Sequence, residues 1–263
     1  MLLQLAAAGE ISPVDFERQL WTLSKGHMRQ ARVYKGGEVR IYRSRAWSIF
    51  DCPRCISDLS YPPKHLTPLN RANIEREPLF YGSAGLPPSF VECGLEAGNY
   101  VVCSEWRTTL DLVLQEVGLA AESDTSEVEQ IYQQIFTSCD SEMYKYSARV
   151  ARHLLSGDPI SGLVYPSVAA QNGSHNLALK TGFVDHGMRF VNAALYIVKN
   201  ITTPHKYETA EIDFATANPD GSLDWKGRIR RWVLRNQGDQ LTMVSTGWSW
   251  DAYNVAGVLV DPE

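Results

Sequence analysis

Two kinds of apolar spacing are mixed irregularly along the chain, and this mixture is the feature that most constrains its fold. Apolar residues recur at helical spacing in the segments 12–25, 126–136 and 141–155. Strand-like runs occupy 39–42, 79–81, 100–103, 162–165, 190–198 and 209–214. Because helices and strands do not alternate steadily, the pattern argues against a doubly wound parallel sheet and predicts an α+β fold.

Local signals sharpen several of these elements. The run from Ser12 to Asp15 offers a capping serine, a proline in the first turn and an acid three residues on, which predicts a helix start. Residues 87–95 open on two prolines and predict a short helix. Residues 209–214 alternate cleanly between apolar and polar, which predicts a strand with one face of each kind. The Ala-Asn-Pro-Asp-Gly run at 217–221 predicts a hairpin turn.

Composition limits the classes of function. Of 263 residues, 44% are hydrophobic and 21% are charged, with a formal net charge of −5, so the chain has no global attraction for nucleic acid. One local basic run consists of Arg228, Arg230, Arg231 and Arg235, and a solvated helix or strand face explains it more simply. No apolar run is long enough to span a membrane, and residues 1–8 are too short for a secretory signal. We therefore expect a cytoplasmic protein that binds neither membrane nor nucleic acid directly.

The cysteines favour a reduced compartment over a disulfide framework, because their number, five, is odd. Cys52 and Cys55 form a lone CxxC without the second pair that a four-cysteine zinc site needs. No metal site is therefore expected. The GxGxxG, GxxxxGK[ST], GxSxG and HExxH motifs are also absent from the sequence.

Three short constellations remain as candidates for chemistry. The first is Tyr42-Arg43 in the early strand. The second comprises the turn 71–73, the strand end 81–83 and Glu92. The third is the strand end 165–167, followed shortly by the Asn-Leu-Ala-Leu run at 176–179. Taken singly, each is explained by ordinary strand ends and surface charges.

Taken together, the three constellations resemble the RES-domain family, which is named for an arginine, a glutamate and a serine in that order. The family pattern has an early Tyr-Arg strand, a turn with arginine and asparagine, and a strand ending in Tyr-x-Ser or Tyr-x-Ala. A glutamate on a helix, a Tyr-Pro-Ser strand end and an Asn-Leu-Ala-Leu-like segment follow. The resemblance covers roughly residues 38 to 200. The chain departs from it in the turn, where Asn70 and Ala72 stand in place of glycine and tryptophan, and in residues 201–263, which extend beyond a small toxin.

The resemblance implies a fold, a substrate and roles for named residues. The fold is an ADP-ribosyltransferase-like split β-sheet core flanked by helices. It would comprise an N-terminal helical segment (1–37), a catalytic domain (38–200) and a C-terminal β-rich extension (201–263). NAD⁺ is the substrate and no cofactor is needed. The implied catalytic residues are Glu92, Arg43 and Ser167, and the implied substrate-binding residues are Arg71, Tyr81, Asn73, Tyr42 and Ser83.

The implied chemistry is cleavage of the nicotinamide–ribose bond. A carboxylate such as Glu92 can stabilise positive charge that develops on the ribose, and a guanidinium of Arg43 or Arg71 can grip pyrophosphate oxygens with paired bonds. Ser167 would orient the ribose or a phosphate, and Tyr81 would stack on nicotinamide. The acceptor, water or phosphate, stays open, as does the choice between the two arginines.

Other readings follow from the same residues. The alternatives are an ADP-ribosyltransferase that modifies a protein or another target, and a catalytically silent NAD-binding module. The resemblance also implies a bacterial toxin neutralised by an antitoxin protein, and a homodimer. Trp225, Trp232, Trp248 and Trp250 gather near the C-terminus, and we expect them to anchor a core rather than to form a ligand cage.

Overall fold

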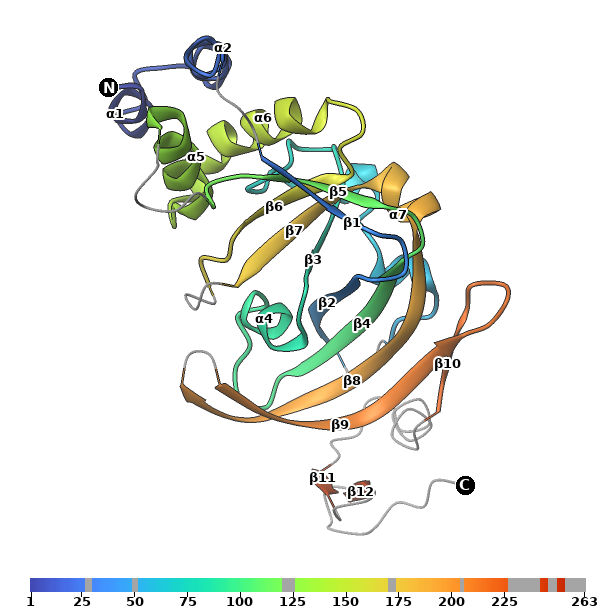
Figure 1. Cartoon of the computed structure of the whole chain (residues 1–263). Coiled ribbons are helices and arrows are strands. Elements are labelled where there is room, and N and C mark those ends of the chain that lie inside the picture. Colours follow the sequence, from blue (N-terminus) through green and yellow to red (C-terminus); the bar gives the residue numbers. More distant parts are fainter. Residues whose placement is uncertain are drawn as a thin grey trace. The chain divides into compact units, whose positions relative to one another are not determined.

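The computed structural model describes residues 1–26, 30–48, 52–119, 126–169, 174–203, 206–226, 242–245 and 250–253. The chain divides into two compact units that interleave along the sequence. Unit 1 comprises 1–41, 60–84 and 107–189, and unit 2 comprises 42–59, 85–106 and 190–263. Both units contain helices and strands (Figure 1), which confirms the predicted α+β class. The predicted segment 38–200 contributes to both units.

Unit 1 is a set of five strands with helices on one face. Its strands follow the order β1-β5-β6-β7-β3, and only the β5–β6 pair among them is parallel. They are β1 (Ala31–Tyr34), β3 (Leu79–Ser83), β5 (Leu112–Glu116), β6 (Gly162–Pro166) and β7 (His175–Lys180). The helices are α1 (Leu2–Ala7), α2 (Pro13–Leu23), η1 (Lys64–Leu66), α5 (Glu127–Thr137), η3 (Ser141–Met143), α6 (Tyr144–Leu155) and α7 (Thr181–Gly187).

The core of unit 1 lies between its strands and helices α1, α2, α5 and α6. Alternate strand residues, Leu79 in β3, Leu163 and Tyr165 in β6 and Ala178 in β7, enter one buried cluster with apolar side chains of those helices. Figure 1 shows α5 and α6 beside β6 and β7. This face of β3, β6 and β7, which we call the helix-covered face, is therefore also the face that carries Tyr81 and Ser83.

The helix starts of unit 1 follow the capping signals. Ser12 Oγ accepts the Asp15 N–H at 3.1 Å and so confirms the predicted start of α2. Ser126 does the same for Glu129 at 3.2 Å at the start of α5. Among the described helices, none is long and apolar enough to cross a bilayer.

Unit 2 is built mainly of antiparallel strands in the order β2-β4-β8-β9-β10. Its strands are β2 (Arg40–Trp47), β4 (Tyr100–Thr108), β8 (Met188–Thr203), β9 (Lys206–Ala217) and β10 (Leu223–Trp225). Two short helices, α3 (Ile56–Leu59) and α4 (Leu86–Val91), accompany them, and β11 (Thr242–Ser245) pairs with β12 (Trp250–Tyr253). A satellite core gathers Phe90, Leu95, Val101, Cys103 and Val198.

The β9 strand corrects one prediction. Leu195 in β8 pairs with Asp213, but the next residue, Tyr196, pairs with Glu211, so the register shifts at Ile212. Ile212 and Asp213 are consequently both buried, at 8% and 4% exposure. The clean alternation predicted for 209–214 is therefore wrong at this point, because a β-bulge interrupts it.

The β9–β10 hairpin of unit 2 forms hydrogen bonds with the CxxC loop. The turn predicted at 217–221 is confirmed, since β9 and β10 pair antiparallel across it. The N–H groups of Ile56 and Leu223 donate to the carbonyls of Gly221 and Arg54 at 2.9 and 2.8 Å. Trp225 is 6% exposed and its Nε1 donates to the carbonyl of Pro53 at 2.8 Å. The core role predicted for Trp225 is thereby confirmed.

Several predictions fall on other parts of the chain. Trp232, Trp248, Arg228, Arg230, Arg231 and Arg235 lie outside the described residues, as does the side chain of Trp250. Several element ends differ from expectation: β3 runs through Gly82 to Ser83, α4 ends at Val91 with Glu92 as its C-cap, and β2, β4, β8 and β9 extend beyond their predicted ranges. The elements without a predicted counterpart include α1, β1, α3, β5, β7 and α7.

Candidate functional site

The residues predicted to form the site fall into two groups, one in each unit. Arg71, Asn73, Tyr81, Ser83 and Ser167 belong to unit 1. Tyr42, Arg43 and Glu92 belong to unit 2. Each group is described within its own unit.

In unit 1, Asn73 and Tyr81 fasten the 70–73 turn to strand β3. The Tyr81 hydroxyl donates to Asn73 Oδ1 at 2.7 Å and accepts the Ala72 N–H at 3.2 Å. Asn73 Nδ2 donates to the carbonyls of Pro68 and Ile74 at 2.8 and 2.9 Å. Asn73 is only 4% exposed, so its amide is buried and hydrogen-bonded at both ends, as a buried amide requires.

Arg71 reaches from the same turn to the end of helix α5. Its Nη1 donates to the carbonyls of Phe136 and Ser138 at 2.6 and 2.9 Å. Its Nη2 lies 3.2 Å from the Tyr144 hydroxyl, and the guanidinium carbon sits 4.9 Å from the Tyr144 ring centre. The last carbonyls of a helix lack intrahelical donors, and Arg71 supplies donors there. Arg71 therefore joins the turn, α5 and the start of α6.

Ser83 and Ser167 lie toward one end of the β3, β7 and β6 strands. Ser83 pairs with Asn176 of β7, and Asn176 pairs in turn with Tyr165 of β6. Directly paired residues project to the same face, so Ser83, Asn176 and Tyr165 form one row on the helix-covered face. Ser167 follows β6 directly, and its N–H donates to the carbonyl of Ser174 at 2.8 Å. Both predicted serines are buried, and the structure brings them to the same region of unit 1.

In unit 2, Arg43 and Glu92 lie around the thiol of Cys93. Burial raises the pKa of Cys93 to about 11, the positive charge of Arg43 opposes that rise, and the negative charge of Glu92 adds to it. Glu92 directly precedes Cys93 in the chain, and Arg43 lies on strand β2. The backbone of Ala46, on the same strand as Arg43, also hydrogen-bonds to the thiol and lowers its pKa.

Strand β2 and helix α4 hold this group in place. Ser44 Oγ and Ser89 Oγ are 2.6 Å apart, which links the strand that carries Arg43 to the helix that precedes Glu92. Ser104 Oγ donates to the carbonyl of Arg43 at 3.2 Å. The Tyr42 ring packs against the satellite core of unit 2. Glu92 itself is exposed, so a ligand can reach its carboxylate.

Sequence reasoning did not assign a role to two polar groups that stand among the predicted residues. Asn176 lies in the row between Ser83 and Tyr165, and Cys93 follows Glu92 in the chain, with Arg43 and Glu92 shifting its pKa in opposite directions. The Asn-Leu-Ala-Leu run points to Asn176, because it is part of the resemblance. No sequence signal marks Cys93, whose neighbours come from β2.

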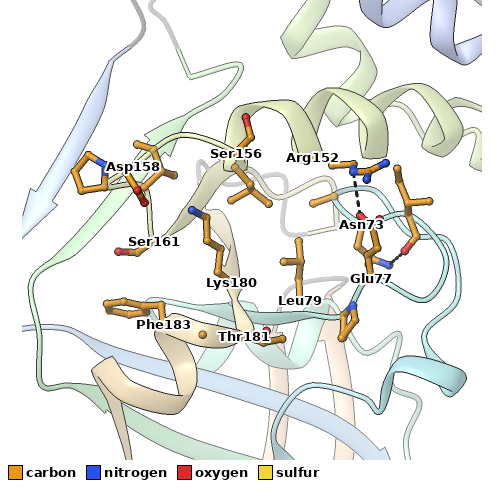
Figure 2. A pocket seen from close by; sticks show the side chains of 17 residues that line it. Asn73, Glu77, Leu79, Arg152, Ser156, Asp158, Ser161, Lys180, Thr181 and Phe183 are labelled. Atoms are coloured by element: carbon orange, nitrogen blue, oxygen red, sulfur yellow. Dashed lines mark hydrogen bonds and ion pairs between the residues drawn. The ribbon is translucent and has the colours of Figure 1, made fainter.

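Unit 1 also contains a pocket of about 710 Å³ (Figure 2). It is lined by the turn at 72–74, residues 77–79, the end of α6, the 156–161 connection and residues 180–183. Of the eight residues predicted to form the site, Asn73 alone lines this pocket.

Metal-ligand clusters and known relatives offer no further assignment. Over the described parts of the chain, no three His, Cys, Asp or Glu side chains are grouped to hold a metal ion. Cys52 and Cys55 are not in a disulfide, and the backbone N–H groups of Arg54 and Cys55 donate to Asp58 Oδ2. Comparison with models of protein families and with curated proteins finds no match for this chain.

Proposed function

We propose that this chain degrades NAD⁺ by cleaving the bond between nicotinamide and ribose, on an ADP-ribosyltransferase-like core of the RES type. The observation that carries the proposal is the 2.6 Å contact between Ser44 Oγ and Ser89 Oγ in unit 2, which joins the strand that carries Arg43 to the helix that Glu92 caps. An arginine and a carboxylate are the two charged groups that this reaction needs. In unit 1, Ser83 lies in the row with Asn176 and Tyr165, and Ser167 follows strand β6 directly.

Glu92 would stabilise the positive charge that develops on the ribose as nicotinamide leaves. It would do so by accepting hydrogen bonds from the ribose hydroxyls. Because nicotinamide departs from a cationic nitrogen as a neutral molecule, the leaving group needs no strong acid. Water or phosphate then attacks the anomeric carbon of the ribose and gives ADP-ribose or its phosphate ester.

A guanidinium can grip the pyrophosphate of NAD⁺ with paired hydrogen bonds. Arg71 donates to Phe136 and Ser138 and lies against Tyr144, all of unit 1, so we give it the task of holding the 70–73 turn. We assign the principal phosphate contact to Arg43, because it belongs to the same unit as Glu92. Within unit 2, Tyr42 would line the substrate beside Arg43 and Glu92. The substrate contacts that the resemblance implies for Ser167, Tyr81, Asn73 and Ser83 of unit 1 stay predictions.

The odd cysteine count predicts a cytoplasmic protein, and the resemblance suggests a toxin that an antitoxin protein neutralises, and a homodimer. The function in this proposal stands apart from those assignments, since NAD⁺ cleavage is measurable with the purified chain alone.

The test is the substitution Glu92→Gln, which keeps the shape of the side chain and removes its charge. We expect NAD⁺ consumption to fall by about a hundredfold or more, as when one electrostatic stabiliser is removed from an active site. Stability should be unchanged because Glu92 is exposed. Glu96→Gln is the matched control, since Glu96 is an exposed acid in the same connection between α4 and β4.

Product analysis with labelled NAD⁺ separates the possible acceptors. Free ADP-ribose indicates water, its phosphate ester indicates phosphate, and label fixed on a macromolecule indicates ADP-ribosyl transfer. Equal NAD⁺ consumption by the wild type and Glu92→Gln would remove Glu92 from the mechanism. An inactive wild type that still binds NAD⁺ would reveal a silent binding module.

A further inference from the structure

The pocket of unit 1 has the size of a small-molecule site. Its volume of about 710 Å³ falls within the range of pockets that hold cofactors and drug-sized ligands. Its wall is largely apolar and includes Leu79, Leu155, Ile160 and Phe183. Figure 2 shows Leu79 and Phe183 on one side and the end of helix α6, with Ser156 and Arg152, on the other.

The two cations of the pocket differ in their partners. Arg152 Nε lies 3.4 Å from Glu77 Oε2, so a carboxylate of the pocket rim already compensates its charge. Lys180 is half-buried at the end of β7, and its Nζ donates to the carbonyl of Gly157 at 3.3 Å. Among the residues that the structure describes, no carboxylate lies within ion-pair distance of Lys180. Asp158 is the other acid that lines the pocket, and it forms no ion pair with Lys180, so the ammonium group lies beside an apolar wall without a carboxylate in direct contact.

We propose that this pocket binds a small organic carboxylate with an apolar body, with its carboxylate on Lys180 and its body against Leu79, Leu155 and Phe183. A charge-assisted hydrogen bond to an ammonium is about twice as strong as a neutral one. The apolar wall adds burial of the ligand body, which contributes in proportion to the area removed from water. The hydroxyls of Ser161 and Thr181, which also line the pocket, can donate to the second carboxylate oxygen.

This pocket is separate from the strand end that carries the predicted serines. Leu79 begins strand β3 and Ser83 ends it, so about 13 Å of strand lies between the two positions. Lys180 likewise pairs with Leu79 at the opposite end of β7 from Asn176. The inference therefore goes beyond NAD⁺ cleavage and assigns a second ligand to unit 1.

The test is calorimetric titration of the full chain with two probes of one shape. The probes are 2-naphthoate and its neutral counterpart 2-naphthylmethanol. We expect the wild type to bind the anion about tenfold more tightly, the difference that one charge-assisted contact supplies. Lys180→Met should abolish this preference and leave the affinity for the alcohol unchanged. Lys64→Met is the matched control, because Lys64 is an exposed lysine of unit 1 outside the pocket.

A second variant tests the place of binding without touching charge. A Cβ added at Gly182 would meet no atom within 4 Å, and Gly182 lines the pocket, so Gly182→Leu adds a bulky side chain at the pocket wall without backbone strain. It should weaken binding of both probes by about tenfold or more. Unchanged affinity of Lys180→Met for naphthoate, no binding by the wild type, or displacement of naphthoate by saturating NAD⁺ would overturn the inference. Because the titration needs no turnover, its result is independent of whether Glu92 supports NAD⁺ cleavage.

Discussion

The two groups of predicted residues differ in what holds their side chains. In unit 1, Asn73, Tyr81 and Arg71 are held by hydrogen bonds to other parts of the same unit, and they fasten a turn and a helix end. In unit 2, Arg43 and Glu92 both affect the pKa of the half-buried Cys93 thiol, and Glu92 is exposed to solvent. The comparison shows that the same motif pattern contains residues that build a frame, such as Asn73 and Arg71, and an exposed acid, Glu92, that a ligand can reach.

The largest effect that tests this comparison is expected at Asn73. Asn73→Ala removes both donors from the carbonyls of Pro68 and Ile74 and the acceptor of the Tyr81 hydroxyl, all in a buried turn. We expect the free energy of unfolding to fall by about 3 kcal/mol, measured by urea denaturation.

Asn70→Ala is the control for Asn73 in the same turn. Asn70 accepts one hydrogen bond, from the Arg71 N–H at 2.7 Å, so its loss should cost only about 1 kcal/mol. If the two substitutions lowered the free energy of unfolding equally, Asn73 would not have the structural role that we assign to it.

Substitution of Arg71 should destabilise the protein less than Asn73→Ala does, and comparison with Arg43 tests which arginine contacts the ligand. Arg71→Met deprives the carbonyls of Phe136 and Ser138 of their donors and should lower the free energy of unfolding by about 2 kcal/mol. Arg43→Met should lower NAD⁺ consumption more than Arg71→Met does, measured at equal concentrations of folded protein. The reverse order of activities would make Arg71 the principal ligand contact and break the comparison.

The smallest effect concerns the reactivity of Cys93. Burial holds its pKa at about 11, so its alkylation by iodoacetamide at pH 8 should be slow and should rise about tenfold for each unit of pH below that value. Glu92→Gln removes a charge that raises this pKa and should speed alkylation, whereas Arg43→Met removes a charge that lowers it and should slow alkylation. We expect changes of about two- to fivefold in either direction.

Mass spectrometry of the labelled peptides distinguishes Cys93 from the other thiols. Exposed Cys139 serves as the internal reference, because it reacts in every variant. Identical Cys93 rates in the wild type and both variants would show that Arg43 and Glu92 do not share a neighbourhood.

The sequence predicts local features of this fold well. The start of α2 at Ser12, the helix α5 and the hairpin turn before β10 all depend on neighbours within a few residues. Strand β5 was not predicted, and its pairing with the parallel strand β6 joins segments that are far apart in the sequence. The bulge at Ile212 also escaped, since it arises from the pairing of β9 with β8 rather than from the β9 sequence.

The candidate site shows the same limit. Motif order alone brings Ser83 and Asn176 into consideration, and the β3–β7 pairing then places them side by side. The partners of Arg71 lie 65 and 67 residues further along the chain, so no local pattern reveals that its guanidinium holds the end of α5. The charge environment of Cys93 is equally a product of tertiary structure, because it combines β2 with the end of α4.

The hydrogen bonds between the CxxC loop and the β9–β10 hairpin affect the order in which unit 2 can fold. The carbonyl of Pro53 accepts a hydrogen bond from the indole of Trp225, which lies 172 residues further along the chain. During synthesis the N-terminal part of a chain leaves the ribosome first. The carbonyls of Pro53 and Arg54 can therefore form these hydrogen bonds only after β10 has been synthesised. Unit 2 is therefore a late product of translation, finished only when nearly all of the described chain has emerged.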